Sequence, residues 1–257
     1  MNAMQAATPL DPCEVLNPGG RSRVVVVCEH ASRRIPATFG DLGLNEADRQ
    51  SHIAWDPGAL AVARGLAVRL DAKLVASTVS RLIYDCNRPP SAPDAMPVRS
   101  EAIDIAGNAR LTPAQRQART SSYYEPFRAS LAAVIAATSD PVIVTVHSFT
   151  PVFHGQPRSV EIGILHDMDA RLADAMMQTA PLHSQMNVQR NEPYGPQDGV
   201  THTLKEHAIR AGHLNVMLEI RNDLIENQQG QDAMADCLAN WIADALEVLQ
   251  ISASVRC

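Results

Sequence analysis

Four apolar runs in the sequence end on polar residues whose types could do chemistry together. The endings are Glu29 and His30 after 24–28, Asp85 to Arg88 after 79–84, His147 and Ser148 after 142–146, and Glu219 with Arg221 at the close of 214–220. One such ending means little, because polar residues follow most strands. Four endings that supply histidines, acids and arginines indicate one assembled site at the edge of a sheet.

The residue types in these endings suit a catalytic metal site. Two imidazoles and one carboxylate leave an open coordination position on a divalent cation such as zinc. Such a cation lowers the pKa of a bound water to about 7 and polarises a carbonyl group. A further carboxylate can accept the water's proton, and an arginine can stabilise an oxyanion or hold a substrate carboxylate. These groups together favour metal-assisted hydrolysis.

Two hydrophobic patterns alternate along the chain, one typical of strands and one typical of helices. The elements that they predict must position these residues. Short β-branched runs predict buried strands, and longer stretches with one apolar face predict helices. The strands are predicted at 23–29, 79–84, 141–146, 160–165 and 214–220. The helices are predicted at 56–70, 112–137, 170–179, 203–211 and 231–249. In the first helix, Asp56 is the expected N-cap and Pro57 the first helical residue.

Strands that alternate with helices predict a single α/β domain, with a central mixed, mostly parallel sheet and helices on both faces. We expect an N-terminal extension at 1–22, the domain at 23–250 and a C-terminal tail at 251–257. The proline-rich segment 89–97 is predicted to be a loop. Ligands of such sheets bind beyond the carboxyl ends of the strands, where the polar endings lie.

Six blocks of the sequence occur in an order that is typical of one protein family. They are CEHASRRIP (28–36), HIAWDPGA (52–59), SRLIYDCNRP (80–89), VHSFTPVFHG (146–155), NEPY (191–194) and LEIRNDLI (218–225). The chain thereby resembles the N-formylglutamate amidohydrolase family over most of its length. The resemblance implies a phosphorylase/hydrolase-like α/β fold, similar to that of the zinc carboxypeptidases and aspartoacylases, with one zinc at the strand ends.

The resemblance implies that His30 and His147 bind this divalent metal together with an acid. Related peptidases carry a glutamate three residues after the first histidine, whereas this chain has Arg33 there. Asp56 and Glu29 are the candidates for the missing ligand. We favour Asp56, because Glu29 adjoins His30 on a strand and should point to the opposite face. Glu29 is then expected to orient an imidazole from behind.

The resemblance also implies the catalytic and substrate-binding roles. Glu219 is similar to the general base of the related peptidases, and Arg81 to their carbonyl-polarising arginine. Asn87 and Arg88 resemble the pair that holds a substrate carboxylate. Asp85 is expected to be a supporting acceptor for Arg88 or for a backbone amide. Further substrate contacts are expected from Ser148, Tyr194 and Arg221.

The composition limits the partners and the compartment. With 28 acidic and 22 basic residues the formal net charge is −6, which predicts no binding to nucleic acid or to an anionic membrane. No apolar run reaches the roughly 18 residues of a membrane helix, and we expect no secretion signal at the N-terminus. The five scattered cysteines lack metal spacing and predict a reducing, cytoplasmic location. The composition is compatible with a homo-oligomer.

The predicted function is metal-dependent hydrolysis of a linear C–N amide bond in a small anionic N-acyl amino acid. In the family's reaction, N-formyl-L-glutamate and water give formate and L-glutamate. The alternative is a non-catalytic protein that binds or senses an acyl amino acid through the same arginines. A cysteine hydrolase that uses Cys86 is a third possibility, although Cys28 and Cys86 are expected to be packing residues.

Overall fold

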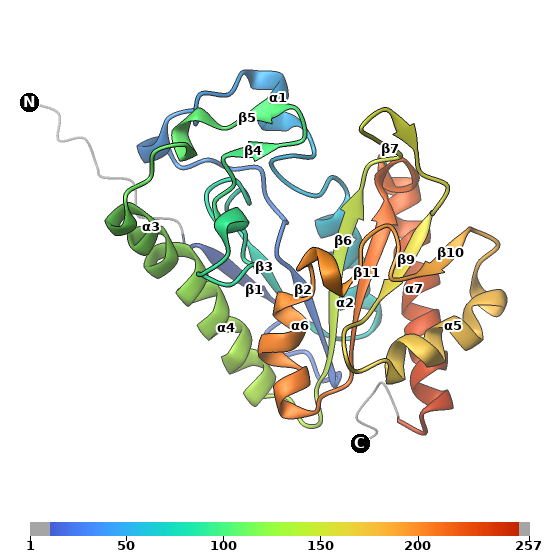
Figure 1. Cartoon of the computed structure of the whole chain (residues 1–257). Helices are drawn as coiled ribbons and strands as arrows, with labels where there is room; N and C mark the ends of the chain where they lie inside the picture. The colour runs from blue at the N-terminus through green and yellow to red at the C-terminus, as the bar shows by residue number, and fades with distance from the viewer. Residues whose placement is uncertain (1–10, 252–257) are drawn as a thin grey trace, which may run out of the picture.

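Seven strands form the central sheet of the protein (Figure 1). They are β1 (Cys13–Leu16), β2 (Val24–Cys28), β3 (Lys73–Ser77), β6 (Val142–Phe149), β9 (Ile162–Leu165), β10 (Val188–Arg190) and β11 (Asn215–Arg221). Their order is β1-β3-β2-β6-β11-β9-β10, in a computed structural model that describes residues 11–251. The four central strands β3, β2, β6 and β11 run parallel, whereas β1 and β9 run antiparallel to their inner neighbours. The predicted single α/β domain with a mostly parallel sheet is confirmed.

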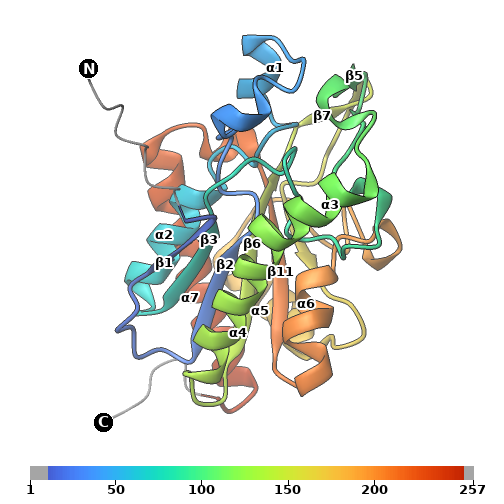
Figure 2. The same ribbon diagram turned by 90° about the vertical axis from the view of Figure 1, so that its left-hand side faces the viewer.

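Helices cover both faces of this sheet (Figure 2). One face carries α2 (Ala59–Arg69), α5 (Arg171–His183) and α7 (Gln228–Val248), and the other carries α4 (Glu125–Ala136) and α6 (His202–His207). Val24, Val26 and Cys28 of β2 pack towards the first group, and Val25 and Val27 pack towards the second. Every residue of β2 is buried, as expected for a strand covered on both faces. No helix within residues 11–251 is long and apolar enough to cross a membrane.

The predicted strand at 79–84 is wrong, because the strand lies earlier, in β3. Residues 79–84 form a bend and a turn, yet four apolar side chains among them are buried: Val79, Leu82, Ile83 and Tyr84. Side chains instead of a strand ladder satisfy the backbone there, since Asn108 donates to the carbonyl of Leu82 and Arg119 to that of Ile83. A short buried apolar run can therefore have the sequence pattern of a strand and still form a packed loop.

Other elements differ from the prediction mainly at their ends. The predicted helix at 112–137 consists of α3 (Pro113–Arg119), a π-helical stretch at Thr120–Tyr124 and α4. The predicted helix at 56–70 begins at Ala59 with Gly58 as its N-cap, so the expected capping by Asp56 is wrong. No sequence pattern predicted the edge strands β1, inside the expected extension at 1–22, and β10. The short α1 (Glu46–Gln50) was also missed.

Two hairpins lie beyond the carboxyl ends of the parallel strands. One consists of β4 (Arg99–Ser100) and β5 (Ile103–Asp104), and the other of β7 (Val152–Phe153) and β8 (Gln156–Pro157). Figure 1 shows β4, β5 and β7 at the top of the view, above this edge of the sheet. Both hairpins contribute residues to the cavity described below.

Gly58, just before α2, has a left-handed backbone conformation. Any side chain at this position is therefore expected to lower the free energy of unfolding. Gly58 has a φ of +81°, and an added Cβ would lie 2.6 Å from the carbonyl oxygen of Ile225. Gly155 is a matched control, since its φ is +75° but nothing lies within 4 Å of an added Cβ. We expect Gly155→Ala to lower the free energy of unfolding by about 1–2 kcal/mol from strain alone, and Gly58→Ala to lower it by about 1–3 kcal/mol more. Urea unfolding measures both, and equal losses would contradict the steric argument.

Candidate active site

A cavity of about 610 Å³ opens at the carboxyl edge of the sheet. Its floor contains side chains from the central strands and the loops that follow them, and its walls include both hairpins. The site residues that line it are His30, Asp56, Arg81, Asp85, Asn87, Arg88, His147, Ser148, Tyr194 and Glu219. The structure therefore brings together ten of the residues that the sequence analysis selected.

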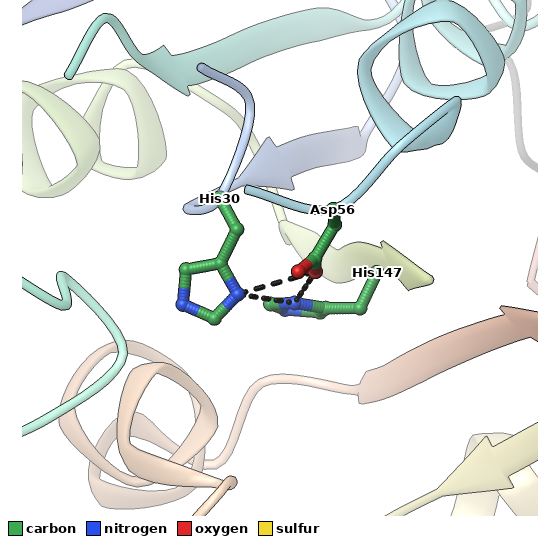
Figure 3. Close-up of side chains that lie close together, drawn as sticks. All are labelled: His30, Asp56 and His147. Carbon is green, nitrogen blue, oxygen red and sulfur yellow. Dashed lines mark hydrogen bonds and ion pairs between the residues drawn. The ribbon is translucent and has the colours of Figure 1, made fainter. Parts of the chain in front are cut away.

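Three of these side chains converge on one point (Figure 3). Oδ2 of Asp56 lies 2.9 Å from Nδ1 of His147 and 3.2 Å from Nδ1 of His30, and the two Nδ1 atoms lie 3.2 Å apart. All three residues are buried, with exposed fractions of 3% or less. The group offers three ligand atoms within 4.8 Å of one another, so it could hold a metal ion.

The local backbone explains why Asp56 joins the histidines. His30 lies two residues beyond the end of β2, and its carbonyl accepts a hydrogen bond from the amide of Asp56 at 3.0 Å. The amide of Ser148 donates to Oδ2 of Asp56 at 3.4 Å, and the Ser148 hydroxyl donates to the Pro57 carbonyl. The carboxylate of Asp56 thus points into the site, and only its backbone carbonyl contacts the start of α2.

Each imidazole has a second carboxylate on its outer side. Nε2 of His30 lies 2.7 Å from Oδ1 of Asp85, and Nε2 of His147 lies 3.1 Å from Oε2 of Glu29. Burial alone would lower the pKa of both histidines, but the neighbouring carboxylates outweigh it and raise the pKa of His30 and, further, that of His147. Burial would likewise raise the pKa of Asp56, but the two imidazoles hold it well below its usual range.

This arrangement fits a tetrahedral divalent metal. Ligand atoms about 2.0–2.1 Å from a tetrahedral zinc lie about 3.3 Å from one another, and the three separations here are 2.9–3.2 Å. Outer carboxylates that accept the Nε2 protons of two histidines leave both Nδ1 atoms free to bind a metal. Asp85 makes such a hydrogen bond with His30, whereas Glu29 lies 3.1 Å from Nε2 of His147 without forming a hydrogen bond. Glu29 faces the outer nitrogen of His147, so the group of described residues that could hold a metal contains Asp56 and not Glu29.

Glu219 is a buried carboxylate that no described group pairs. It lies opposite His147 in the parallel register of β6 and β11, which places both side chains on the same face of the sheet. It is 5% exposed, and its Oε2 has no hydrogen-bond partner. Burial is the main cause that raises the pKa of Glu219 from 4.5 to about 7. A carboxyl group with such a pKa can both accept and return a proton near neutral pH.

Gly163 makes room for this carboxylate. It is the residue of β9 opposite Glu219, and a Cβ there would overlap the Glu192 carbonyl oxygen and lie 3.1 Å from the Cβ of Glu219.

The guanidinium of Arg81 lies beside the three converging residues. It donates to Oδ2 of Asp85 at 2.7 Å and to Oδ1 of Asp56 at 3.4 Å. Its side chain is 27% exposed and borders the cavity. Burial would lower the pKa of Arg81, but these two carboxylates raise it, so the group stays charged. It can therefore present positive charge to a ligand in the cavity.

The other expected substrate contacts differ in their surroundings. The amide of Asn87 is used within the protein, since it donates to the Val200 carbonyl and accepts from the Thr203 amide. Arg88 uses Nε and Nη1 on Asp94 and two carbonyls, which leaves Nη2 for the cavity. Tyr194 lines the cavity, whereas Arg221 does not. Arg221 contacts Asp223, Glu161 and the Arg158 carbonyl instead.

Sequence reasoning missed Arg158, which lines the cavity from the segment after β8. No spacing or capping pattern marks it, because it reaches the site through tertiary packing alone. His52 and Glu101 were also missed; both line the cavity, and Nε2 of His52 lies 2.6 Å from Oε1 of Glu101. Cys86, by contrast, is 2% exposed and does not line the cavity, and burial raises its pKa well above the usual value. It is a packing residue, as is Cys28.

A mostly parallel sheet with acid–base groups, arginines and a candidate metal centre in one cavity at its carboxyl edge defines a hydrolase built on a single α/β domain. The family model for N-formylglutamate amidohydrolase matches residues 22–226. The chain therefore belongs to the N-formylglutamate amidohydrolase family, which confirms the resemblance seen in the sequence.

Two solved structures are similar to the chain over almost its whole length. The gene product Atu2144 from Agrobacterium tumefaciens is 53% identical, with a TM-score of 0.91, and the match covers 93% of this chain and 96% of that one. The N-formylglutamate amidohydrolase from Ralstonia eutropha JMP134 is 20% identical, with a TM-score of 0.63, and the match covers 94% and 99%. No curated protein matches the sequence.

In metal-free protein, the raised pKa of Glu219 predicts that the stability difference between the wild type and Glu219→Gln depends on pH. Because the folded carboxyl group holds its proton more tightly than the unfolded one, the wild type loses stability as the pH rises from about 4.5 through about 7. Glu219→Gln cannot ionise and avoids this loss. We expect the variant to gain about 3 kcal/mol on the wild type between these limits. Urea unfolding at several pH values measures this gain, with the exposed Glu226→Gln as the control. A difference independent of pH would contradict the prediction.

Proposed function

We propose that the protein hydrolyses a linear amide bond in a small anionic N-acyl amino acid with the help of one divalent metal. The observation that carries the proposal is the unpaired, buried Glu219 beside two histidines and an aspartate whose ligand atoms converge. A protein that only binds its ligand has no use for a carboxylate with a pKa of about 7 at this position.

His30, Asp56 and His147 would hold the metal, which we propose to be zinc because of the nitrogen and oxygen donors. When bound, the metal supplies a Lewis acid that polarises the acyl carbonyl and makes a water more acidic. Asp85 and Glu29, next to the outer nitrogens of His30 and His147, keep the two imidazoles in orientation from behind.

Glu219 acts as the general base and then as the general acid. It takes a proton from the attacking water and returns it to the leaving amine, which breaks the C–N bond. Arg81 lies at the border of the cavity with its charge fixed by Asp85 and Asp56, and it stabilises the negative charge that develops on the carbonyl oxygen.

The substrate's anionic part lies towards the arginines of the cavity. Nη2 of Arg88 binds a carboxylate there, and Asn87 holds the loop of Arg88 in place through its two contacts with residues 200 and 203. Tyr194 and Ser148 border the same space. N-formyl-L-glutamate is the first substrate to test, because the family and a structural neighbour carry this name.

The first experiment measures metal content together with hydrolysis. Purified protein should contain about one zinc per chain, and release of formate and L-glutamate from N-formyl-L-glutamate should cease on chelation and return with zinc. His30→Ala and His147→Ala should lose both properties. His213→Ala is the control, because its side chain lies outside the cavity. Ligand binding that survives chelation, with no product from any N-acyl amino acid, would favour the sensing protein instead.

Replacement of the proposed base separates metal binding from catalysis. We expect Glu219→Gln to keep its metal and to lower kcat about 10²- to 10⁴-fold, because the amide cannot accept the water's proton. Stopped assays of formate release with parallel metal analysis measure both quantities. Glu226→Gln, on the surface, should leave kcat unchanged. Full activity in Glu219→Gln would exclude its role as the base.

A further inference from the structure

Four arginines line the cavity, and three of them are paired with acids. Arg81 is paired with Asp85 and Asp56, Arg88 with Asp94, and Arg99 with Asp104. Arg158 lines the same cavity but has no carboxylate within ion-pair distance among residues 11–251. Within the described part of the chain, the guanidinium of Arg158 therefore has no acidic partner.

Aromatic rings hold the guanidinium of Arg158 in place. Its central carbon lies 4.3 Å from the ring centroid of Phe153, 4.9 Å from that of Tyr194 and 5.5 Å from that of Phe149. Such contacts stabilise a cation through the ring faces but do not cancel its charge. They restrict the side chain to one orientation, which lowers the entropy cost of binding a ligand.

Most of the hydrogen-bond donors of Arg158 remain available. Nη2 donates to the hydroxyl of Tyr194 at 3.0 Å, and Nη1 makes a long contact of 3.5 Å with the Thr150 carbonyl. A guanidinium has five N–H donors, so three are left for a ligand. Two parallel N–H groups match the two oxygens of a carboxylate.

The backbone of Arg158 is also fixed. Its amide donates to the Pro151 carbonyl at 2.8 Å, and its carbonyl accepts from Nη1 of Arg221 at 3.3 Å. Arg221 is itself held by Asp223 and Glu161. Arg221 thus positions the segment that carries Arg158, although it does not reach the cavity.

Tyr194 connects Arg158 to the reacting end of the cavity. Tyr194 lines the same cavity as Arg158 and Glu219, and its hydroxyl accepts the hydrogen bond from Nη2 of Arg158. A ligand that contacts Arg158 would extend along Tyr194 towards the acid–base groups.

We infer that Arg158 is a carboxylate-binding residue that recognises a substrate carboxylate remote from the scissile amide. The inference rests on the proposed function for its substrate class. It adds a second anion contact to the single free Nη2 of Arg88. The carboxylate is either the α-carboxylate or a side-chain carboxylate, and matched substrates distinguish these two sources.

The test compares three substrates with wild type and Arg158→Gln. They are N-formyl-L-glutamate, N-formyl-L-glutamine with a neutral side chain, and N-formyl-L-isoglutamine with a neutral α-carboxamide. Loss of a hydrogen-bonded charge pair should raise KM for N-formyl-L-glutamate about 10- to 100-fold in the variant. The penalty should disappear on the one substrate that lacks the carboxylate bound by Arg158, which identifies that carboxylate. A merely structural role would penalise all three substrates alike, and that result would overturn the inference.

Arg171→Gln is the control, since it removes an acid-paired arginine that lies outside the cavity. It should leave all three KM values unchanged. Calorimetric binding of N-formyl-L-glutamate to Glu219→Gln, with and without Arg158→Gln, tests the inference apart from turnover. If wild type hydrolyses none of the substrates but binding weakens at least tenfold with Arg158→Gln, the proposed function fails and the carboxylate site stands. An affinity for N-formyl-L-glutamate that is unchanged by Arg158→Gln would overturn the carboxylate site itself.

Discussion

The structure of the site depends on the burial of four carboxylates around two imidazoles. Glu29, Asp56, Asp85 and Glu219 are all 5% exposed or less. A buried charge without a partner costs several kcal/mol, so each acid must be compensated or hold a proton. His30, His147 and Arg81 compensate three of them. Glu219 is the one left over, which is why its affinity for a proton rises and why it can act in acid–base chemistry.

The sheet holds this arrangement of charges in place. Parallel strands bring their carboxyl ends to one edge, and the register of β6 with β11 sets His147 beside Glu219. Gly163 of β9 supplies the space on the other side of Glu219. Helices on both faces keep water away from the strands below the site. The side chains proposed to react are thus attached to buried central strands and to the loops that follow them, as a precise site requires.

The sequence was sufficient for the fold and for most of the site because strand ends are local signals. His147 and Glu219 lie within strands and His30 lies two residues after one, and parallel strands place such residues at one edge. The strand expected at 79–84 failed because burial alone cannot distinguish a strand from a packed loop.

Long-range contacts account for what the sequence did not reveal. Asp56 was expected both to cap the helix at 56–70 and to join His30 and His147, and only the second expectation agrees with the structure, in which its carboxylate contacts two imidazoles that are 26 and 91 positions away in the chain. Arg158 reaches the cavity by packing on Tyr194, 36 positions away, and Arg221 supports it from another strand. No local periodicity records such contacts.

The walls of the cavity and its converging side chains come from different parts of the fold. Each can therefore change in evolution without the other. The converging ligand atoms belong to β6 and to the loops after β2 and before α2, whereas β4–β5 and β7–β8 form small sheets of their own beside the cavity. Insertions or substitutions in these hairpins can reshape the walls without moving the reacting groups. Relatives with the same strands can therefore keep one reaction and diverge in which amides they accept.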